Sequence, residues 1–200
     1  STSITVNQNP TANAGDVMSA ICQGATSAVM NGSTAGGATG GTWSGGAGSW
    51  TNATDKANAT YTAGAAESGS ITLTLTTTGS SCTPVTATKN ITVNANPTAI
   101  ASTSTGTVCE DATISLTGGA SGGSGGGYSY SWSGPSSYSS SDQSPTISAD
   151  ATTAMAGSYL LTVTDGNTCS SASSSTSITV NQNPTAIAST STGTVCEDAT

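Results

Sequence analysis

Apolar residues alternate with serine and threonine along most of this chain. In residues 158–164, for example, Tyr159, Leu161 and Val163 recur at every second position. Successive side chains of a β-strand point to opposite faces, so a period of two predicts a strand with one buried face. No stretch has a convincing helical period, and the chain is therefore expected to be all-β.

The same alternation predicts short strands throughout both halves of the chain. They are expected at residues 20–22, 27–30, 41–44, 58–62, 70–76 and 89–93, and again at 113–117, 128–132, 145–148, 158–164 and 177–181. Asp165 and Gly166 form a dipeptide that favours a tight hairpin turn. The glycine runs at 36–48 and 118–127 are expected to be flexible loops, because no Gly-Lys-Ser/Thr and no helix follow them as in a phosphate loop.

The chain also repeats itself at long range. Residues 1–12, STSITVNQNPTA, return at 175–186, and the eighteen residues from 96 return from 183. The Asn-Pro pairs begin at Asn9, Asn96 and Asn183, always 87 residues apart. A fixed period of this size indicates tandem structural units.

Around seven short strands in each repeat suit an immunoglobulin-like β-sandwich. We therefore expect tandem sandwiches with an 87-residue period: residues 1–8 as the last strand of a preceding module, 9–95 as module 1, 96–182 as module 2, and 183–200 as the start of a further module. The two modules are expected to stack end to end.

The core of each sandwich follows from the alternation. The residues expected to be buried are Ile21, Val29, Trp43, Tyr61, Ile71, Leu73, Leu75, Ile91 and Val93 in module 1, and Val108, Ile114, Leu116, Trp132, Ile147, Tyr159, Leu161, Val163, Ile178 and Val180 in module 2.

Composition then removes several classes of function. The chain has no histidine, only two basic residues and a net charge of -8. Histidine-based catalysis and histidine-ligated metals are excluded, and the charge opposes nucleic-acid binding. No apolar run is long enough to span a bilayer, so no membrane insertion is expected in this segment. We expect no enzyme and no cofactor.

The aromatic residues have a structural and a functional interpretation. Trp43 and Trp132 fit the core tryptophan of a sandwich better than a sugar-stacking platform. Trp50, among small polar residues, is the best candidate for an exposed aromatic ring. Tyr159 follows Ala-Gly-Ser, as in a tyrosine corner whose hydroxyl tethers a neighbouring connection.

A calcium site is the only metal candidate. Glu110 and Asp111 are adjacent carboxylates, and Asp165 of a neighbouring module could add oxygen ligands of the kind calcium prefers. No Asp-x-Asp-x-Asp loop is present, and module 1 lacks the acidic pair. A solvated turn is the favoured interpretation.

The five cysteines admit three schemes. Pairing within modules would join Cys22 to Cys82 and Cys109 to Cys169. In a sandwich, however, these partners would lie about 20 Å apart at opposite poles, beyond the reach of a disulfide. Pairing Cys22 with Cys169 across the joint between modules is therefore preferred, with free thiols as the third alternative.

Several of these motifs resemble a known family. ATISLTGG, YSYSWSGP, AGSYLLTVTD followed by a cysteine, and SITVNQNPTA look like the tandem immunoglobulin-like or PKD-like repeats of giant cell-surface proteins of the Bacteroidetes, of the gliding-adhesin, type IX-secreted kind. The resemblance implies an extracellular, cell-surface filament or stalk with an adhesive role. Its partners would be neighbouring modules, other fibre chains or surface glycans.

Two other functions stay open at this stage. The modules could be carbohydrate-binding or spacer regions of a secreted polysaccharide-degrading enzyme, or they could belong to a phage fibre. An exposed flat row of aromatic rings would favour the carbohydrate-binding interpretation, whereas buried rings favour the stalk.

Overall fold

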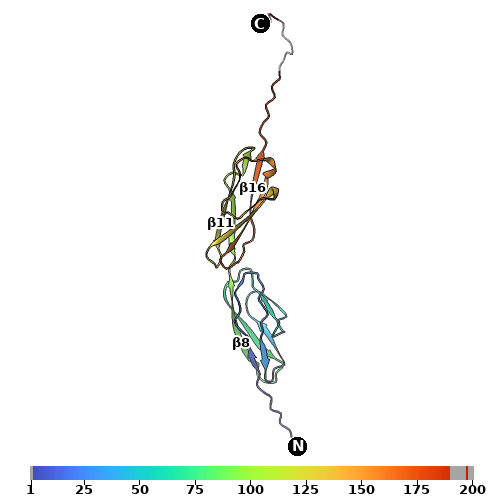
Figure 1. Cartoon of the computed structure of the whole chain (residues 1–200). Coiled ribbons are helices and arrows are strands. Elements are labelled where there is room, and N and C mark those ends of the chain that lie inside the picture. The colour runs from blue at the N-terminus through green and yellow to red at the C-terminus, as the bar shows by residue number, and fades with distance from the viewer. Residues whose placement is uncertain (1, 190–196, 198–200) are drawn as a thin grey trace.

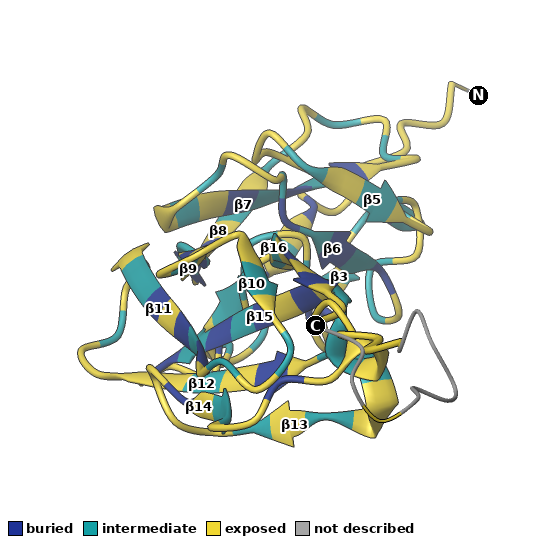
Figure 2. Cartoon of the chain, turned by 90° about the horizontal axis from the view of Figure 1, so that it is seen from above, coloured by how far each residue is buried: buried dark blue, intermediate teal, exposed yellow. Residues whose placement is uncertain are grey.

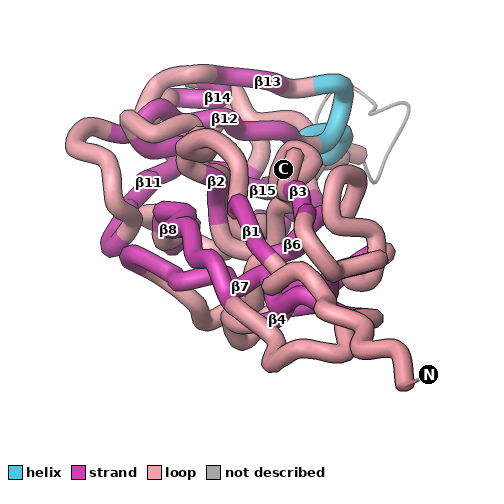
Figure 3. The backbone as a smooth tube through the Cα atoms, turned by 90° about the horizontal axis from the view of Figure 1, so that it is seen from below, coloured by secondary structure: helices cyan, strands magenta, loops and turns pink. Residues whose placement is uncertain are grey.

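The computed structural model describes residues 2–189 and 197, and they form two β-sandwiches stacked end to end (Figure 1). The N-terminus and the C-terminal side lie at opposite ends of the elongated molecule (Figure 1). Strands and connecting loops make up nearly all of the chain. Two short 3-10 turns, η1 (Pro135–Ser137) and η2 (Thr153–Met155), are the helical elements among the described residues (Figure 3).

Module 1 is built from three small sheets. The largest has the strand order β2 (Ile21–Cys22), β8 (Thr86–Asn94), β7 (Gly69–Thr78), β4 (Gly40–Ser44). The second pairs β1 (Thr11–Asn13) with β3 (Ser33–Ala35), and the third pairs β5 (Ser49–Thr51) with β6 (Thr60–Thr62). The long central hairpin of β7 and β8 is antiparallel, whereas β2 joins β8 in parallel.

Module 2 has two sheets, one of five strands and one of three. One is ordered β10 (Thr107–Cys109), β16 (Ser174–Asn181), β15 (Gly157–Asp165), β12 (Tyr128–Ser133), β13 (Ser139–Ser140), and the other β14 (Thr146–Ser148), β11 (Ile114–Gly122), β9 (Pro97–Thr103). Strand β10 pairs with β16 in parallel, as β2 pairs with β8 in module 1.

Each module has its own apolar core, formed by the strand faces that the alternation predicts. Buried and exposed positions alternate along β11 and β15 (Figure 2). The larger fully buried side chains are Met30, Trp43, Tyr61, Leu73, Leu75, Ile91 and Val93 in one core, and Ile114, Leu116, Trp132, Tyr159 and Leu161 in the other. Ile21, Ile71, Val108 and Ile147 are partly buried against these cores.

Three expectations from the sequence are wrong. Val29 is 41% exposed, because residues 27–30 form an irregular segment that turns Met30 inward instead. Residues 118–122 belong to β11 and not to a flexible loop. They pair antiparallel with β9, a strand that the alternation did not predict.

The core of module 1 also contains a lysine. The Lys89 ammonium donates a 2.7 Å hydrogen bond to the Met30 carbonyl and lies 5.6 Å from the centre of a Trp43 ring. Burial lowers the Lys89 pKa, and the nearby Asp16 charge acts in the opposite direction. The stem of the lysine packs as an apolar chain, while its charge is met by a carbonyl and an aromatic face.

Candidate functional site, the joint between the modules

The joint is short. Strand β8 ends at Asn94 and β9 begins at Pro97, so Ala95 and Asn96 alone separate the two sandwiches along the chain. The residue before a proline is restricted to extended backbone, which limits the conformations open to Asn96. Two restrained residues leave little freedom for the modules to move independently.

A disulfide crosses this joint and connects Cys22 to Cys169, with their Cα atoms 5.5 Å apart. Cys22 ends β2, where it pairs with Asn94 at the exit of module 1. Cys169 follows the turn after β15 at the entrance of module 2. This is the inter-module pairing preferred from the sequence, and it leaves no place for the intra-module bonds of Cys22 with Cys82 or of Cys109 with Cys169. Among the described residues, Cys82 and Cys109 are unpaired.

Hydrogen bonds hold the peptide linker beside the disulfide. Gln23, which follows Cys22, accepts the Asn96 backbone N–H on its side-chain oxygen at 2.9 Å. The Asn96 amide donates to the Gln23 carbonyl at 3.3 Å. On the other side, the Ala95 N–H donates to the Ser124 hydroxyl of module 2 at 2.6 Å. The linker is therefore bonded to both modules.

Asp165 organises the module 2 side of the joint. Its side chain is 5% exposed. One carboxylate oxygen accepts the N–H groups of Asn167 and Cys169, each at 3.0 Å. The other accepts those of Ser124 and Gly125, each at 3.1 Å. One carboxylate thus connects the loop that contacts the linker to the turn that carries the disulfide.

These contacts decide the ionisation of Asp165. Burial alone would raise its pKa, but the N–H groups of Gly125, Cys169, Ser124 and Asn167 together outweigh burial and lower the pKa. Hydrogen bonds to a carboxylate favour its charged form. Asp165 therefore stays ionised as a backbone anchor.

The calcium candidates do not come together at this joint. Asp165 uses both oxygens on backbone N–H groups. Glu110 and Asp111 lie at the far end of module 2, where each accepts a hydrogen bond from Asn183. Within residues 2–189 and 197, no three histidine, cysteine or acidic side chains form a group that could hold a metal ion. At the described joint, the positions of the acidic pair are occupied by Gln23 and Gly24.

The tryptophans named from the sequence are buried in the two cores. Trp43 is 2% and Trp132 is 1% exposed. Their indole N–H groups donate to the carbonyls of Lys56 at 3.0 Å and Gln143 at 3.3 Å, two positions 87 residues apart. Neither ring is open to a ligand.

Tyr159 forms the corner that the sequence predicts. Its ring is 1% exposed, and its hydroxyl donates to the Met155 carbonyl at 2.8 Å. Burial raises its pKa, and the neighbouring Tyr138 adds to this effect. The bond ties β15 to η2.

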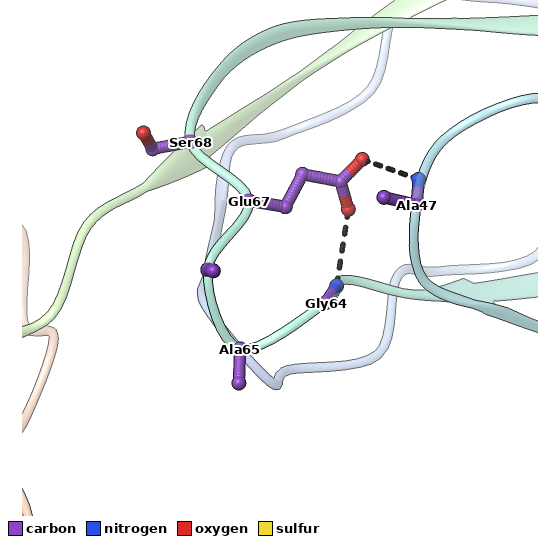
Figure 4. A pocket seen from close by; sticks show the side chains of 6 residues that line it. Ala47, Gly64, Ala65, Glu67 and Ser68 are labelled. Atoms are coloured by element: carbon purple, nitrogen blue, oxygen red, sulfur yellow. Dashed lines mark hydrogen bonds between the residues drawn. The ribbon is translucent and has the colours of Figure 1, made fainter.

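Module 1 uses a different corner, which the sequence did not predict. The Tyr61 hydroxyl donates to Glu67, and the other bonds to this carboxylate come from the N–H groups of Ala47 at 2.8 Å and Gly64 at 3.0 Å (Figure 4). Burial works against the charge of Glu67, but these three donors outweigh it and lower its pKa. A shallow pocket over this corner is lined mainly by small residues and backbone.

Trp50 is not a free platform. Its ring stacks on Trp43 with centroids 5.9 Å apart and packs against Tyr61 at 5.1 Å. Its indole N–H donates to the Gly45 carbonyl at 3.1 Å. The ring covers the edge of the module 1 core.

Sequence reasoning found the two cysteines of the joint but missed Gln23, Ser124 and the anchoring role of Asp165. The Asn-Pro pair at each repeat boundary was the available signal, because Asn96 is the linker residue that Gln23 holds. In the described part of the chain, every helix is too short to cross a membrane.

The chain matches no family model, and a search of curated proteins gave no match. Similar solved structures include the amphioxus IgVJ-C2 molecule, with 15% identity and a TM-score of 0.37 over 71% of this chain and 89% of that chain. A three-immunoglobulin-domain fragment of titin has 16% identity and a TM-score of 0.40, over 89% and 67%. The fibronectin(III)-like modules of Clostridium thermocellum CbhA have 16% identity and a TM-score of 0.37, over 87% and 95%.

These likenesses concern the fold alone. The sheet order and the two separate cores described above are those of two β-sandwiches in tandem.

Proposed function

We propose that the chain is a structural segment of an extracellular filament or stalk, in which tandem sandwiches of 87 residues space an adhesive element away from a cell surface. The module boundaries follow the repeat, at residues 9–95 and 96–182. The observation that carries the proposal is the disulfide between Cys22 and Cys169, which adds a second covalent connection beside the peptide linker.

The mechanism is mechanical. Two modules joined by one peptide can bend and twist about it. A disulfide beside the linker removes much of that freedom, and the bonds from Gln23 and Ser124 restrain what remains. The longest strand, β7, has 10 residues and spans about 33 Å, since a strand rises about 3.3 Å per residue. Stiff joints turn such units into a rod.

The disulfide also supports an extracellular location. Disulfides persist in oxidising compartments and are rare where thioredoxin and glutathione keep thiols reduced. The sequence resemblance to repeats of bacterial surface proteins points the same way and is the reason for proposing a cell-surface filament of that kind.

The aromatic side chains favour this proposal over carbohydrate binding. Trp43, Trp132 and Tyr159 are buried, and Trp50 packs against Trp43. Tyr128, 38% exposed, is the one aromatic residue among the large exposed hydrophobic side chains of the described chain. A single ring does not make the flat row on which a sugar chain stacks.

Residual dipolar couplings test the proposal. If the joint is rigid, one alignment tensor fits the backbone couplings of both modules in the oxidised protein. The double variant Cys22→Ser/Cys169→Ser should then require two different tensors. Cys82→Ser, which removes a cysteine outside the joint, is the matched control and should leave the single tensor unchanged. Separate tensors for the two modules of the oxidised wild type would contradict a stiff segment.

A further inference from the structure

The far end of module 2 repeats the geometry of the joint. At the joint, the Gln23 N–H donates to the Asn94 carbonyl at 2.9 Å; at the far end, the Glu110 N–H donates to the Asn181 carbonyl at 2.9 Å. Glu110 and Asn181 lie 87 residues after Gln23 and Asn94. The last strand of each module, β8 in module 1 and β16 in module 2, is therefore held at its end by the same bond.

The asparagine that leaves the module is held in the same way too. Asn96 donates its N–H to the Gln23 side-chain oxygen and its amide to the Gln23 carbonyl, at 2.9 and 3.3 Å. Asn183 donates its N–H to the Glu110 carboxylate and its amide to the Glu110 carbonyl, at 3.2 and 3.3 Å. The chain beyond module 2 thus starts out along the path that the linker takes between the modules.

Cys109 occupies the place of Cys22 in this arrangement. Cys22 pairs in parallel with Asn94, and Cys109 pairs in parallel with Asn181. Cys22 is bonded to Cys169 of the next module, whereas Cys109 is exposed and unpaired.

At the opposite end of the molecule, Cys82 occupies the place that Cys169 has at the joint. Cys82 follows β7 as Cys169 follows β15, exactly one period earlier in the sequence. Its sulfur lies 3.9 Å from the carbonyl of Asn7, in the segment that enters module 1. The Cys82 N–H is fixed by the Ser80 hydroxyl at 3.0 Å, and the thiol is unpaired.

We propose that Cys109 and Cys82 each form a further disulfide between modules, placed as the bond between Cys22 and Cys169 is; such a disulfide across a joint is called a staple below. Cys109 bonds the cysteine in the turn after the β15-equivalent strand of a following module. Cys82 bonds the cysteine that ends the strand equivalent to β2 in a preceding module. Each bond joins positions 147 residues apart, as Cys22 and Cys169 are. The partner at each end is a module of the same kind in a longer chain, so this inference rests on the proposed function.

The chemistry is a two-electron oxidation. Two thiols lose two protons and two electrons and form one S–S bond. The electrons pass to the disulfide of a thiol–disulfide oxidoreductase, which becomes a dithiol. The attack requires open access to the sulfur, a condition that the exposed Cys109 meets.

An extended chain tests the inference. Because residues 183–200 repeat residues 96–113, a copy of residues 114–182 added after Thr200 completes a third module. In a Cys82→Ser background, oxidised protein is digested before aspartates without reduction. The fragment 55–110, which then carries Cys109 as its only cysteine, should be linked to the fragment that carries the added counterpart of Cys169. The link should be present in most molecules and absent in Cys109→Ser.

A second extended chain guards against failure of the added module to fold. In it, residues 9–95 follow residue 182, and the partner of Cys109 should be the added counterpart of Cys82. Cys109 left open to alkylation in both chains, while Cys22 and Cys169 are linked, would overturn this inference and leave the proposed function standing. Loss of the link between Cys22 and Cys169 in the same digests would instead count against the proposed function.

Discussion

The Asp165 carboxylate accepts the backbone N–H of Cys169 at 3.0 Å, so a buried charge fixes the turn that carries one half of the staple. Ser124 and Gly125 donate to the same carboxylate from the loop that meets the linker. The joint therefore depends on a carboxylate that holds both the turn that carries Cys169 and the loop that meets the linker.

Asp165→Asn should loosen the turn of the joint. An amide offers one acceptor oxygen in place of two, so at least two of the four backbone N–H groups lose their partner. Hydrogen exchange should become faster by about tenfold or more at two or more of the amides of Asn167, Cys169, Ser124 and Gly125, the equivalent of losing about one buried hydrogen bond each.

The exposed Asp150→Asn is the matched control and should leave these four amides unchanged. Equal protection of the amides in Asp165→Asn and in the wild type would show that the carboxylate does not hold the turn.

Trp132→Ala should unfold module 2 while leaving module 1 folded. The ring is 1% exposed, and truncating a buried tryptophan costs about 3–5 kcal/mol. Thermal unfolding followed by circular dichroism should show the module 2 transition lowered or lost. Tyr128→Ala, at a 38% exposed ring, is the comparison and should shift the transition far less. A Trp132→Ala protein with wild-type stability would rule out the core role.

Tyr159→Phe tests the corner without removing the ring. It deletes the hydroxyl that donates to Met155, a bond that contributes about 1 kcal/mol when buried. The midpoint of denaturant unfolding of module 2 should fall accordingly. Tyr128→Phe removes an exposed bond to the Gly122 carbonyl, which water can replace, and should have a smaller effect. The corner assignment fails if the two variants behave alike.

Glu67 makes the stability of module 1 depend on pH, with lower stability in acid. Its pKa in the folded protein is lowered from the ordinary value of 4.5, so the folded state binds the proton less readily than the unfolded chain does. The stability that its hydrogen bonds supply is complete above pH 4.5 and is lost as the pH falls through the lowered folded value.

Unfolding of module 1 by denaturant between pH 7 and pH 3 should therefore show falling stability on the acid side. In Glu67→Gln that slope should be reduced, and the stability at pH 7 should be lower. Glu110→Gln, at a turn outside module 1, is the control. If the stability of module 1 fell with pH as steeply in Glu67→Gln as in the wild type, Glu67 would not be the cause of the acid sensitivity.

The sequence predicted what depends on strict alternation and missed what depends on irregular backbone. Leu161 and Val163 are buried because every second side chain of a strand faces the core. Val29 is exposed because its segment is not a strand, and alternation says nothing about an irregular path. The pairing of residues 118–122 with β9 was hidden because glycines carry no apolar signal.

The joint was predictable in part. The positions of Cys22 and Cys169 follow from sandwich topology, which puts them at facing poles of consecutive modules. Gln23 and Asp165 could not be assigned, because their roles are bonds to backbone N–H groups whose placement depends on the turns around them. The buried Lys89 was missed because only its carbonyl partner at Met30 and the Trp43 ring make burial tolerable.

The central claim is that Cys22 and Cys169 join the two modules, and disulfide mapping tests it most directly. Cleavage before aspartates places Cys22 on fragment 16–54, Cys82 and Cys109 together on 55–110, and Cys169 together with Cys196 on 165–197. Without reduction, fragment 16–54 should be linked directly to 165–197, and Cys169→Ser should abolish that link. A link between fragments 16–54 and 55–110 that Cys82→Ser removes would instead show pairing within module 1 and would contradict the disulfide across the joint.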